Sequence, residues 1–477
     1  MGNGNITNDI VQKLWNLCSL LREDGVTYHQ YVTELTYLLF LKMLKETGRE
    51  DVLPKHYCWD DLAKKDGTEQ LEFYKRLLLD LSTKGANRVR EIYTDAGTTL
   101  RQPKILTALV KAIDDLQWYS ADREHIGDLY EGLLEKNATE VKSGAGQYFT
   151  PRPLVECMVE VVKPRAGERV QDPAAGTAGF LIAADRYVRS QTTDYFELET
   201  KQQEFQKYQA FYGVELVADT RRLALMNLML HNIEGDLLLG DTLSPLGAGL
   251  DKADVILTNP PFGTKKGGGR PTRDDFTFPT SNKQLAFVEH IYRSLKPGGR
   301  AAVVVPDNVL FEDNVGAEIR ADLMDKCNLH TILRLPTGIF YAQGVKTNVL
   351  FFTRGKTDKG NTRAVWIYDL RANMPSFGKR TPLTHEHFKP FEFAFGNDPN
   401  GNGSRKDEGP ESRFRRFTRA DIKARGDNLD ITWLRDESSD RGNETTSPLI
   451  IAEQVREQLK IALSEIDALG TILSDAS

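Results

Sequence analysis

The fold of this chain is decided by residues 169–180, RVQDPAAGTAGF, where a short apolar stretch runs into a turn of small residues. We expect Arg169–Asp172 to form a β-strand and Gly179–Arg189 to form the helix that follows it. Small residues let the backbone bend sharply, and the N-terminus of the helix then offers free N–H groups to a ligand. The full GxGxxG pattern is missing, which disfavours a phosphate-binding dinucleotide fold but suits a cofactor that contains adenosine. An ordinary strand–helix turn is the alternative.

Short apolar stretches alternate with helical ones after this point, as in a parallel sheet with crossover helices. We therefore expect an α/β fold with a seven-stranded, mostly parallel sheet. Its predicted strands are Arg169–Asp172, Phe211–Glu215, Leu237–Gly240, Asp254–Thr258, Arg300–Pro306, His330–Leu335 and Asn348–Thr353. Helices fit between them at Gly179–Arg189, Asp219–His231, Lys283–Leu295 and Gly316–Asp325. No helix separates the last two strands, so we expect an antiparallel pair at one end of the sheet.

The segments on either side of this α/β core differ from it in hydrophobic pattern and composition. Residues 1–140 predict an all-α N-terminal domain, because apolar residues recur on one helix face and alternating β-branched residues are scarce. Residues 141–395 contain the α/β pattern. Residues 396–447 predict a loop-rich linker, because Gly, Asn, Asp, Pro and Ser gather at its start. An apolar stripe in residues 448–477 predicts a C-terminal helix.

Composition excludes several classes of function. The 477 residues are 40% hydrophobic and 27% charged, which is typical of a folded globular protein. Lys and Arg number 62 against 68 Asp and Glu, a net charge of −6, which excludes a mainly electrostatic nucleic-acid binder. Four scattered cysteines without a CxxC pair favour a reducing cytoplasm over a disulfide scaffold or a zinc site. The apolar stretch Leu35–Leu41 is too short to span a bilayer, so we expect no membrane contact.

Two further strand ends carry acidic residues. Glu215 ends its predicted strand, where a carboxylate can accept hydrogen bonds from both hydroxyls of a ribose. Asp241 and Thr242 follow the next strand, where an acidic side chain can meet the exocyclic amine of an adenine. The alternatives are a surface glutamate at position 215 and a turn or helix cap at Asp241.

The most specific motif is Asn259-Pro260-Pro261-Phe262, directly after a predicted strand. Two prolines fix the backbone and remove two donors, which leaves carbonyl acceptors beside a side-chain amide oxygen. Such a turn can accept hydrogen bonds from both hydrogens of a planar NH2 group. Phe262 adds a face on which a flipped base can stack. A rigid turn with a core aromatic is the alternative.

In this order, the motifs resemble those of S-adenosylmethionine-dependent DNA adenine-N6 methyltransferases. More narrowly, the chain resembles the methylation (M) subunits of type I restriction-modification systems. That resemblance rests on Asp128-Leu129-Tyr130-Glu131, on residues 146–154, GQYFTPRPL, and on the helical N-terminal domain. It covers nearly the whole chain and implies a Rossmann-like methyltransferase sheet with an all-α N-terminal domain and a C-terminal helical tail.

The resemblance implies roles for individual residues. The segment that closes over the methionine end of the cofactor would contain Gln147, Tyr148, Phe149, Thr150, Pro151 and Arg152. The turn beneath the cofactor would contain Asp172, Ala174, Gly176, Thr177, Ala178 and Gly179, with Ala178 where many adenine methyltransferases have glycine. Glu215 would bind the ribose, and Asp241 with Thr242 would lie at the adenine. The catalytic turn would comprise Asn259, Pro260, Pro261 and Phe262.

The resemblance also implies the reaction and the partners. The expected reaction is site-specific methyl transfer to N6 of a flipped adenine in double-stranded DNA. The expected partners are a specificity (S) subunit that reads the target, a second copy of the M subunit and a motor–nuclease (R) subunit. The glycine-rich loop after Phe262 carries Lys265, Lys266 and Arg270, which are candidate contacts to DNA phosphates. A solvated loop is the alternative there. The C-terminal helix and the N-terminal helices are candidate docking surfaces, unless that helix packs on its own domain.

Two other functions stay open at this stage. The Asn-Pro-Pro-aromatic turn suits any planar NH2 group, so a methyltransferase that acts on a protein glutamine or on RNA is one alternative. A non-catalytic assembly subunit is the other, although all four chemical clusters are intact. No P-loop pattern GxxxxGK[ST] is present, so the chain itself is not the motor subunit.

Overall fold

The computed structural model describes residues 3–26, 31–116, 118, 126–140, 149–262, 271–340, 345–375, 377–378 and 381–434. The chain divides into two compact units. The first is formed by Met1–Phe149 and Pro164–Thr242, and the second by Thr150–Lys163 and Leu243–Ser477. No helix among the described residues is long and apolar enough to cross a membrane. The domain boundaries predicted from the sequence stay a prediction.

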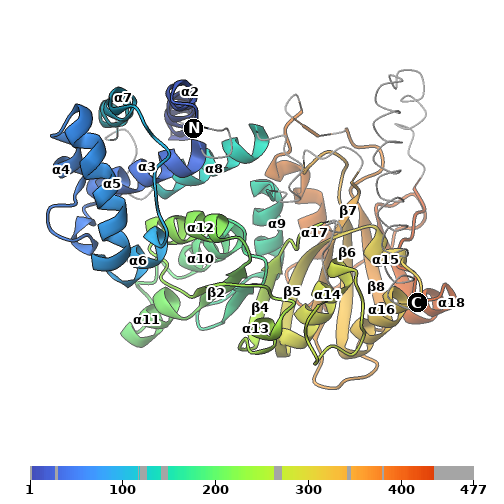
Figure 1. Ribbon diagram of the computed structural model, residues 1–477. Helices are drawn as coiled ribbons and strands as arrows, with labels where there is room; N and C mark the ends of the chain where they lie inside the picture. The colour runs from blue at the N-terminus through green and yellow to red at the C-terminus, as the bar shows by residue number, and fades with distance from the viewer. Residues whose placement is uncertain are drawn as a thin grey trace, which may run out of the picture. The chain divides into compact units, whose positions relative to one another are not determined.

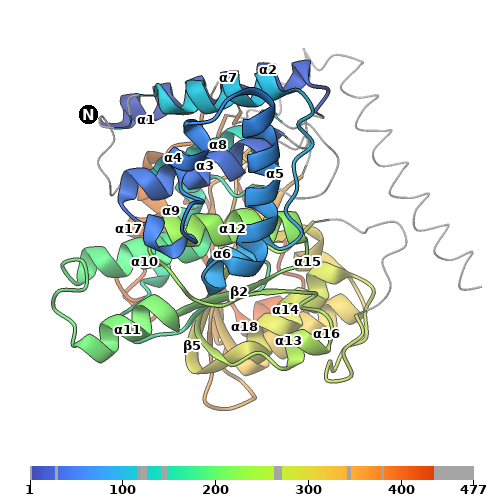
Figure 2. The same ribbon diagram turned by 60° about the vertical axis from the view of Figure 1, so that its left-hand side comes forward.

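The first part of the first unit is helical, as the sequence predicts. Its helices are α1 (Asn3–Asn16), α2 (Cys18–Glu23), α3 (Tyr31–Thr47), η2 (Glu50–Val52), α4 (Trp59–Ala63), α5 (Gly67–Lys84), α6 (Asn87–Tyr93), α7 (Pro103–Asp114) and α8 (Ile126–Glu140). Helix α3 is the centre of this bundle: α2, α4, α7 and α8 all pack against it (Figure 2). Its leucine-rich sequence is therefore buried on most sides.

The α/β part of the first unit is a parallel sheet with the strand order β3-β2-β1. Its strands and helices are β1 (Val170–Asp172), α10 (Gly179–Gln191), α11 (Thr200–Tyr208), β2 (Phe211–Glu215), α12 (Ala218–Leu230) and β3 (Leu237–Leu239). Asp172 lies opposite Gly213, and Glu215 lies opposite Leu239. Because parallel strands end at the same edge, the turns that follow β1, β2 and β3 lie side by side.

The second unit holds a mixed sheet with the order β4-β5-β7-β6-β8-β9 (Figure 1). Its strands are β4 (Ala253–Thr258), β5 (Leu295–Pro306), β6 (Cys327–Arg334), β7 (Thr347–Arg354), β8 (Ala364–Asp369) and β9 (Phe414–Thr418). Strand β7 runs antiparallel to β5 and β6, and β9 runs antiparallel to β8. The helices are α9 (Arg152–Val162), α13 (Pro245–Ala248), α14 (Lys283–Ser294), α15 (Asn308–Phe311), α16 (Val315–Lys326), η5 (His385–His387), α17 (Lys389–Phe395) and α18 (Arg419–Ala424).

The α/β class and the seven predicted strands are confirmed, but two strands were missed. Strands β8 and β9 continue the sheet beyond β6, so the antiparallel β6–β7 pair lies inside the sheet and the prediction that it ends the sheet is wrong. Strand β9 is rich in arginine, and its Phe414 packs on Trp366 of β8, with ring centroids 4.8 Å apart. An edge strand tolerates charged side chains, which hides it from a search for apolar stretches. The predicted C-terminal helix at 448–477 lies outside the described residues.

A glycine inside β2 is required by the close approach of β1. A Cβ added at Gly213 would lie 2.5 Å from the carbonyl oxygen of Asp172 and 3.2 Å from the Cβ of Ala175. Gly213→Ala is therefore expected to lower the free energy of unfolding by about 1–3 kcal/mol, because backbone must move to make room. Urea denaturation measures this change.

The matched control is Gly403→Ala, since a Cβ at Gly403 would meet no atom within 4 Å. That variant should stay within about 0.5 kcal/mol of the wild-type protein. Equal unfolding free energies for the two variants would contradict the packing argument.

Candidate active site

The turn after β1 is shaped by its own backbone conformation. Asp172 Oδ1 accepts a hydrogen bond from the N–H of Ala174 at 3.0 Å. Gly176 and Ala178 have φ angles of 53° and 68°, so two residues of the turn are left-handed. Ala178 is fully buried and caps the N-terminus of α10. A left-handed alanine costs about 1–2 kcal/mol relative to glycine, which is why glycine suits this position.

Glu215 joins the end of β2 to this turn. Its Oε2 accepts a hydrogen bond from the N–H of Gly176 at 2.9 Å, and its Oε1 accepts one from the N–H of Val217 at 2.8 Å. The residue is 7% exposed, and burial raises the pKa of its carboxyl group although the backbone N–H groups of Val217, Gly176 and Leu216 partly oppose the rise. Each carboxylate oxygen can still accept a second hydrogen bond. A ribose with two neighbouring hydroxyls fits those acceptors.

The turn after β3 is tied to the turn after β1. The hydroxyl of Thr242 donates to the carbonyl oxygen of Pro173 at 2.6 Å, and Thr242 is buried. Its side chain therefore holds the two turns together. Asp241, the preceding residue, is exposed.

Apolar side chains beside Glu215 are left uncovered. Leu216 and Leu239 are 55% and 49% exposed. Leu216 follows Glu215 in the chain, and Leu239 lies opposite it in the sheet. Uncovered aliphatic groups next to a carboxylate offer both contacts that an adenosine needs: hydroxyls on the carboxylate and the base on the leucines.

Asn227 on α12 is a further residue that contacts the turn after β1, and the sequence motifs did not include it. It is 1% exposed, and its Nδ2 donates to the carbonyl oxygen of Thr177 at 2.9 Å. It therefore holds the turn after β1 from the side of the helix. The one available signal was an amide inside the apolar stretch LMNLM, residues 225–229.

The turn after β4 belongs to the second unit. Thr258, the last residue of the strand, is fully buried, whereas Asn259 is half-buried and Pro261 is exposed. The Nδ2 of Asn259 donates to Oγ1 of Thr150 at 2.9 Å. Its Oδ1 is buried and has no hydrogen-bond partner among the described residues. The amide is thus held at its nitrogen and left open at its oxygen.

The aromatic residue of this turn is anchored by a second ring. Phe262 meets Phe340 in an edge-to-face contact, with ring centroids 5.6 Å apart and ring planes at 89°. Phe340 is buried and Phe262 is half-buried. Edge-to-face pairs fix the orientation of both rings. Phe340, which follows β6, was not singled out by the sequence reasoning, because a lone aromatic in a loop carries no pattern.

The remaining predicted residues divide between described and undescribed parts of the chain. Phe149, Thr150 and Arg152 are half-buried, and Pro151 is buried as the N-cap residue of α9. Gly179 is the first residue of α10. The predicted cofactor and DNA contacts that lie outside the described residues are Gln147, Tyr148, Lys265, Lys266 and Arg270.

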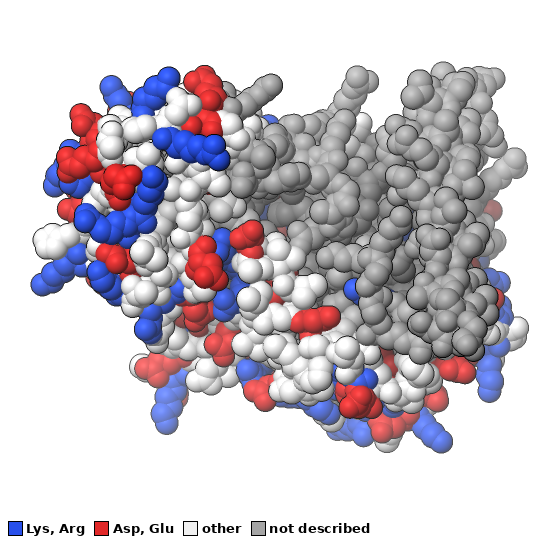
Figure 3. All heavy atoms as spheres, viewed as in Figure 1, with Lys and Arg blue, Asp and Glu red and all other residues white. Residues whose placement is uncertain are grey.

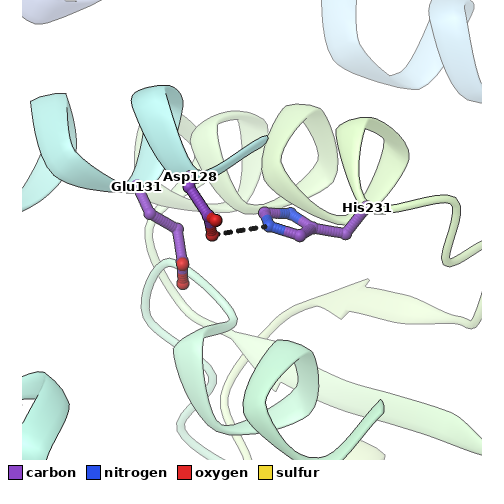
Figure 4. A group of neighbouring side chains, drawn as sticks. All are labelled: Asp128, Glu131 and His231. Atoms are coloured by element: carbon purple, nitrogen blue, oxygen red, sulfur yellow. Dashed lines mark ion pairs between the residues drawn. The ribbon is translucent and has the colours of Figure 1, made fainter. Parts of the chain in front are cut away.

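Asp128, Glu131 and His231 gather three possible metal ligands in the first unit (Figure 4). Arg186 Nη2 lies 2.6 Å from Asp128 Oδ1 and 3.6 Å from Glu131 Oε2. His231 Nε2 lies 3.9 Å from Asp128 Oδ1, and its Nδ1 lies 2.9 Å from the carbonyl oxygen of Asn227. The guanidinium supplies the positive charge that these carboxylates need. The cluster is therefore an ion-pair network that ties α8 to α10, and we assign it no metal.

Comparison with known proteins identifies the family. Residues 121–440 match the N-6 DNA Methylase family model, and residues 10–113 match the HsdM N-terminal domain model. The chain belongs to the N-6 DNA methylase family. Over 502 aligned residues it is 53% identical to the type I restriction enzyme EcoKI methylase subunit of Escherichia coli (strain K12), covering 97% of this chain and 94% of that protein. The StySPI methylase subunit of Salmonella potsdam matches with the same identity of 53% and the same coverage, 97% and 94%.

A solved structure agrees with this assignment. The crystal structure of the EcoKI M protein matches at 49% identity with a TM-score of 0.60, covering 98% of this chain and 96% of that one. This N-6 DNA methylase is therefore the modification subunit of a type I restriction-modification system, and it methylates N6 of adenine in DNA.

If Glu215 binds the ribose of the cofactor, its raised pKa predicts that cofactor binding depends on pH. An ionised carboxylate offers two acceptor oxygens to ribose hydroxyls, and protonation turns one of these oxygens into a donor. Because burial raises this pKa above the usual 4.5, S-adenosylmethionine affinity should be constant near neutral pH. It should then fall as the pH drops through the raised pKa, which lies above 4.5. Isothermal titration calorimetry at several pH values measures this dependence.

Two variants make the test specific. Glu215→Gln should bind S-adenosylmethionine roughly 10- to 100-fold more weakly at neutral pH, because hydrogen bonds to a charged group are removed, and its affinity should no longer change with acid. Glu204→Gln, at an exposed glutamate of α11, should behave as wild type. A Glu215→Gln protein with wild-type affinity and a wild-type pH profile would rule out the ribose role.

Proposed function

We propose that this subunit transfers the methyl group of S-adenosylmethionine to a flipped adenine that is gripped by the turn Asn259–Phe262. The observation that carries the proposal is the open end of the Asn259 amide: Oδ1 is buried and has no partner among the described residues, while Nδ2 is held by Thr150. An unpaired buried acceptor costs about 1–3 kcal/mol. The exocyclic amine of an adenine supplies the missing donor.

The chemistry follows from the poor nucleophilicity of that amine, whose lone pair is delocalised into the ring. Asn259 Oδ1 and the carbonyl oxygen of Pro260 each accept one N–H hydrogen bond, which favours a pyramidal nitrogen and frees its lone pair. Phe262 stacks on the base and holds it in this position. Catalysis is therefore positioning with electrostatic stabilisation, and no covalent intermediate with the enzyme forms.

The proposed cofactor residues lie at the ends of β1, β2 and β3. S-adenosylmethionine, when bound, supplies an activated methyl group on a sulfonium. Glu215 binds the two ribose hydroxyls, and Leu216 with Leu239 covers the adenine. The turn Asp172–Gly179 approaches the cofactor with its backbone, and Thr242 holds that turn in place. Asp241 at the adenine remains part of the proposal on the strength of the family resemblance. So do the neighbours of Thr150 in its segment, which are proposed to lie at the methionine end: Gln147, Tyr148, Phe149, Pro151 and Arg152.

We infer that a separate specificity subunit reads the DNA target. The net charge of −6 argues against strong DNA binding by this chain alone. Basic and acidic side chains are intermingled over the described residues of the face in Figure 3, without a patch of one sign. A second M subunit and the motor–nuclease subunit complete the proposed restriction complex. Residues 448–477 and the N-terminal helices are the proposed docking surfaces.

Removal of the Asn259 side chain tests the proposed reaction. In the complex with its specificity subunit, Asn259→Ala should lower the methylation rate at least roughly 100-fold, because an acceptor in the transition state is removed. Affinity for S-adenosylmethionine should change less than about twofold, because Asn259 binds the amine and not the cofactor. Mass spectrometry of N6-methyladenine in the treated DNA measures the rate, and calorimetry measures the affinity.

Asn402→Ala, at an exposed asparagine of the same unit, is the control and should be fully active. Near-normal methylation by Asn259→Ala would overturn the assignment.

The glycine-rich loop is proposed to contact DNA phosphates on the strength of its sequence. Replacement of Lys265, Lys266 and Arg270 by glutamate should weaken DNA binding by the assembled complex. It should also reduce the slope of log affinity against log salt by about one for each phosphate that the loop no longer neutralises. Fluorescence anisotropy over a salt series measures both quantities. Unchanged affinity and slope would remove this loop from the DNA interface.

A further inference from the structure

The amide of Asn259 can bind an amine only if its oxygen points to that amine. The two ends of an asparagine amide have nearly the same shape, and the terminal torsion of the side chain is broad. The orientation is therefore set by hydrogen bonds. In the described structure, the amide nitrogen of Asn259 donates to Oγ1 of Thr150 at 2.9 Å.

We propose that Thr150 is a positioning residue for methyl transfer, because its hydroxyl oxygen pairs the amide nitrogen of Asn259 while the amide oxygen binds the target amine. This inference rests on the proposed function and names a further residue of the same site. Without an acceptor at position 150, the productive orientation would bury an unpaired NH2 group. The reversed orientation would instead place the N–H donors of Asn259 against those of the substrate amine.

The position of Thr150 is fixed by the second unit itself. Thr150 directly precedes α9, whose N-cap is Pro151, and α9 packs against β4 and β5. At the other end of α9, Arg300 of β5 donates to the carbonyl oxygens of Val162 and Lys163, at 2.6 Å in both cases. Helix α9 is thus held to the sheet that carries Asn259. The hydrogen bond between Thr150 and Asn259 spans 109 positions in the chain and joins two anchored elements.

This role differs from a contact to the methionine end of the cofactor, which the family resemblance implies for the same segment. A cofactor contact acts on the affinity for S-adenosylmethionine. A positioning contact to Asn259 acts on the rate of transfer after both substrates are bound. The two roles can therefore be distinguished by measuring the affinity for S-adenosylmethionine and the single-turnover rate of methyl transfer on the same variant.

The test uses two replacements of Thr150 in the complex with the specificity subunit. Thr150→Val keeps the branched shape and removes the acceptor, whereas Thr150→Ser keeps the hydroxyl and removes a methyl group. At saturating S-adenosylmethionine, we expect Thr150→Val to slow single-turnover methylation roughly 10- to 100-fold. Thr150→Ser should stay within about threefold of wild type, and both variants should bind S-adenosylmethionine within about twofold of wild type. If Thr150→Val proves unstable, Thr150→Ala is compared with Thr150→Ser, since these two differ in the hydroxyl alone.

Three results would overturn the inference. The first is a wild-type rate for Thr150→Val. The second is a weaker affinity for S-adenosylmethionine with a normal rate at saturation, which indicates a cofactor contact. The third is a slow Thr150→Ser beside a fast Thr150→Val, which indicates a packing role for the methyl group. A wild-type complex that makes no N6-methyladenine would instead overturn the proposed function, so the two failures are distinguishable.

Discussion

A single side-chain amide is held at one end and open at the other. The amide nitrogen of Asn259 donates a hydrogen bond to Oγ1 of Thr150. Its amide oxygen is buried and has no partner among the described residues. Buried polar groups are usually paired, so this open acceptor suits the role that we propose for it, as the acceptor of a donor on the substrate. The prolines that follow fix the backbone around it, and Phe262 beside Phe340 supplies an anchored ring. The proposed chemistry depends on this one unfilled position.

In the first unit, buried side chains likewise hold the turn that we propose for the cofactor. Three buried side chains hydrogen-bond to the backbone of the turn after β1: Glu215 to Gly176, Thr242 to Pro173 and Asn227 to Thr177. The turn is thereby formed before any ligand arrives, which lowers the entropy cost of binding. Left-handed backbone at Ala178 is tolerated because these contacts fix the residues around it. In both units, hydrogen bonds from side chains thus hold a turn at the end of a parallel strand.

Patterns within short stretches of sequence predicted the strands and the Asn259–Phe262 turn, because neighbouring residues determine these features. Alternation of apolar stretches located the seven strands, and Asn259-Pro260-Pro261-Phe262 could be interpreted because its chemistry lies within four consecutive residues. Strand β9 was not predicted, because its arginines fit a strand only at the edge of a sheet. Whether a strand lies at an edge depends on the whole sheet and cannot be read from the strand's own residues. Asn227 and Phe340 were not predicted, because each contacts the site through a residue that is distant in the sequence. The pairing of Thr150 with Asn259 across 109 positions is invisible to any local pattern.

The most direct measurement is a structure of the assembled complex with its target DNA and a non-reactive analogue of S-adenosylmethionine. The extruded adenine should place N6 within about 2.7–3.2 Å of Asn259 Oδ1, with the amide nitrogen still on Thr150 and the base stacked on Phe262. An adenine whose N6 faces away from Asn259, or an amide turned so that its nitrogen meets the base, would contradict the central claim.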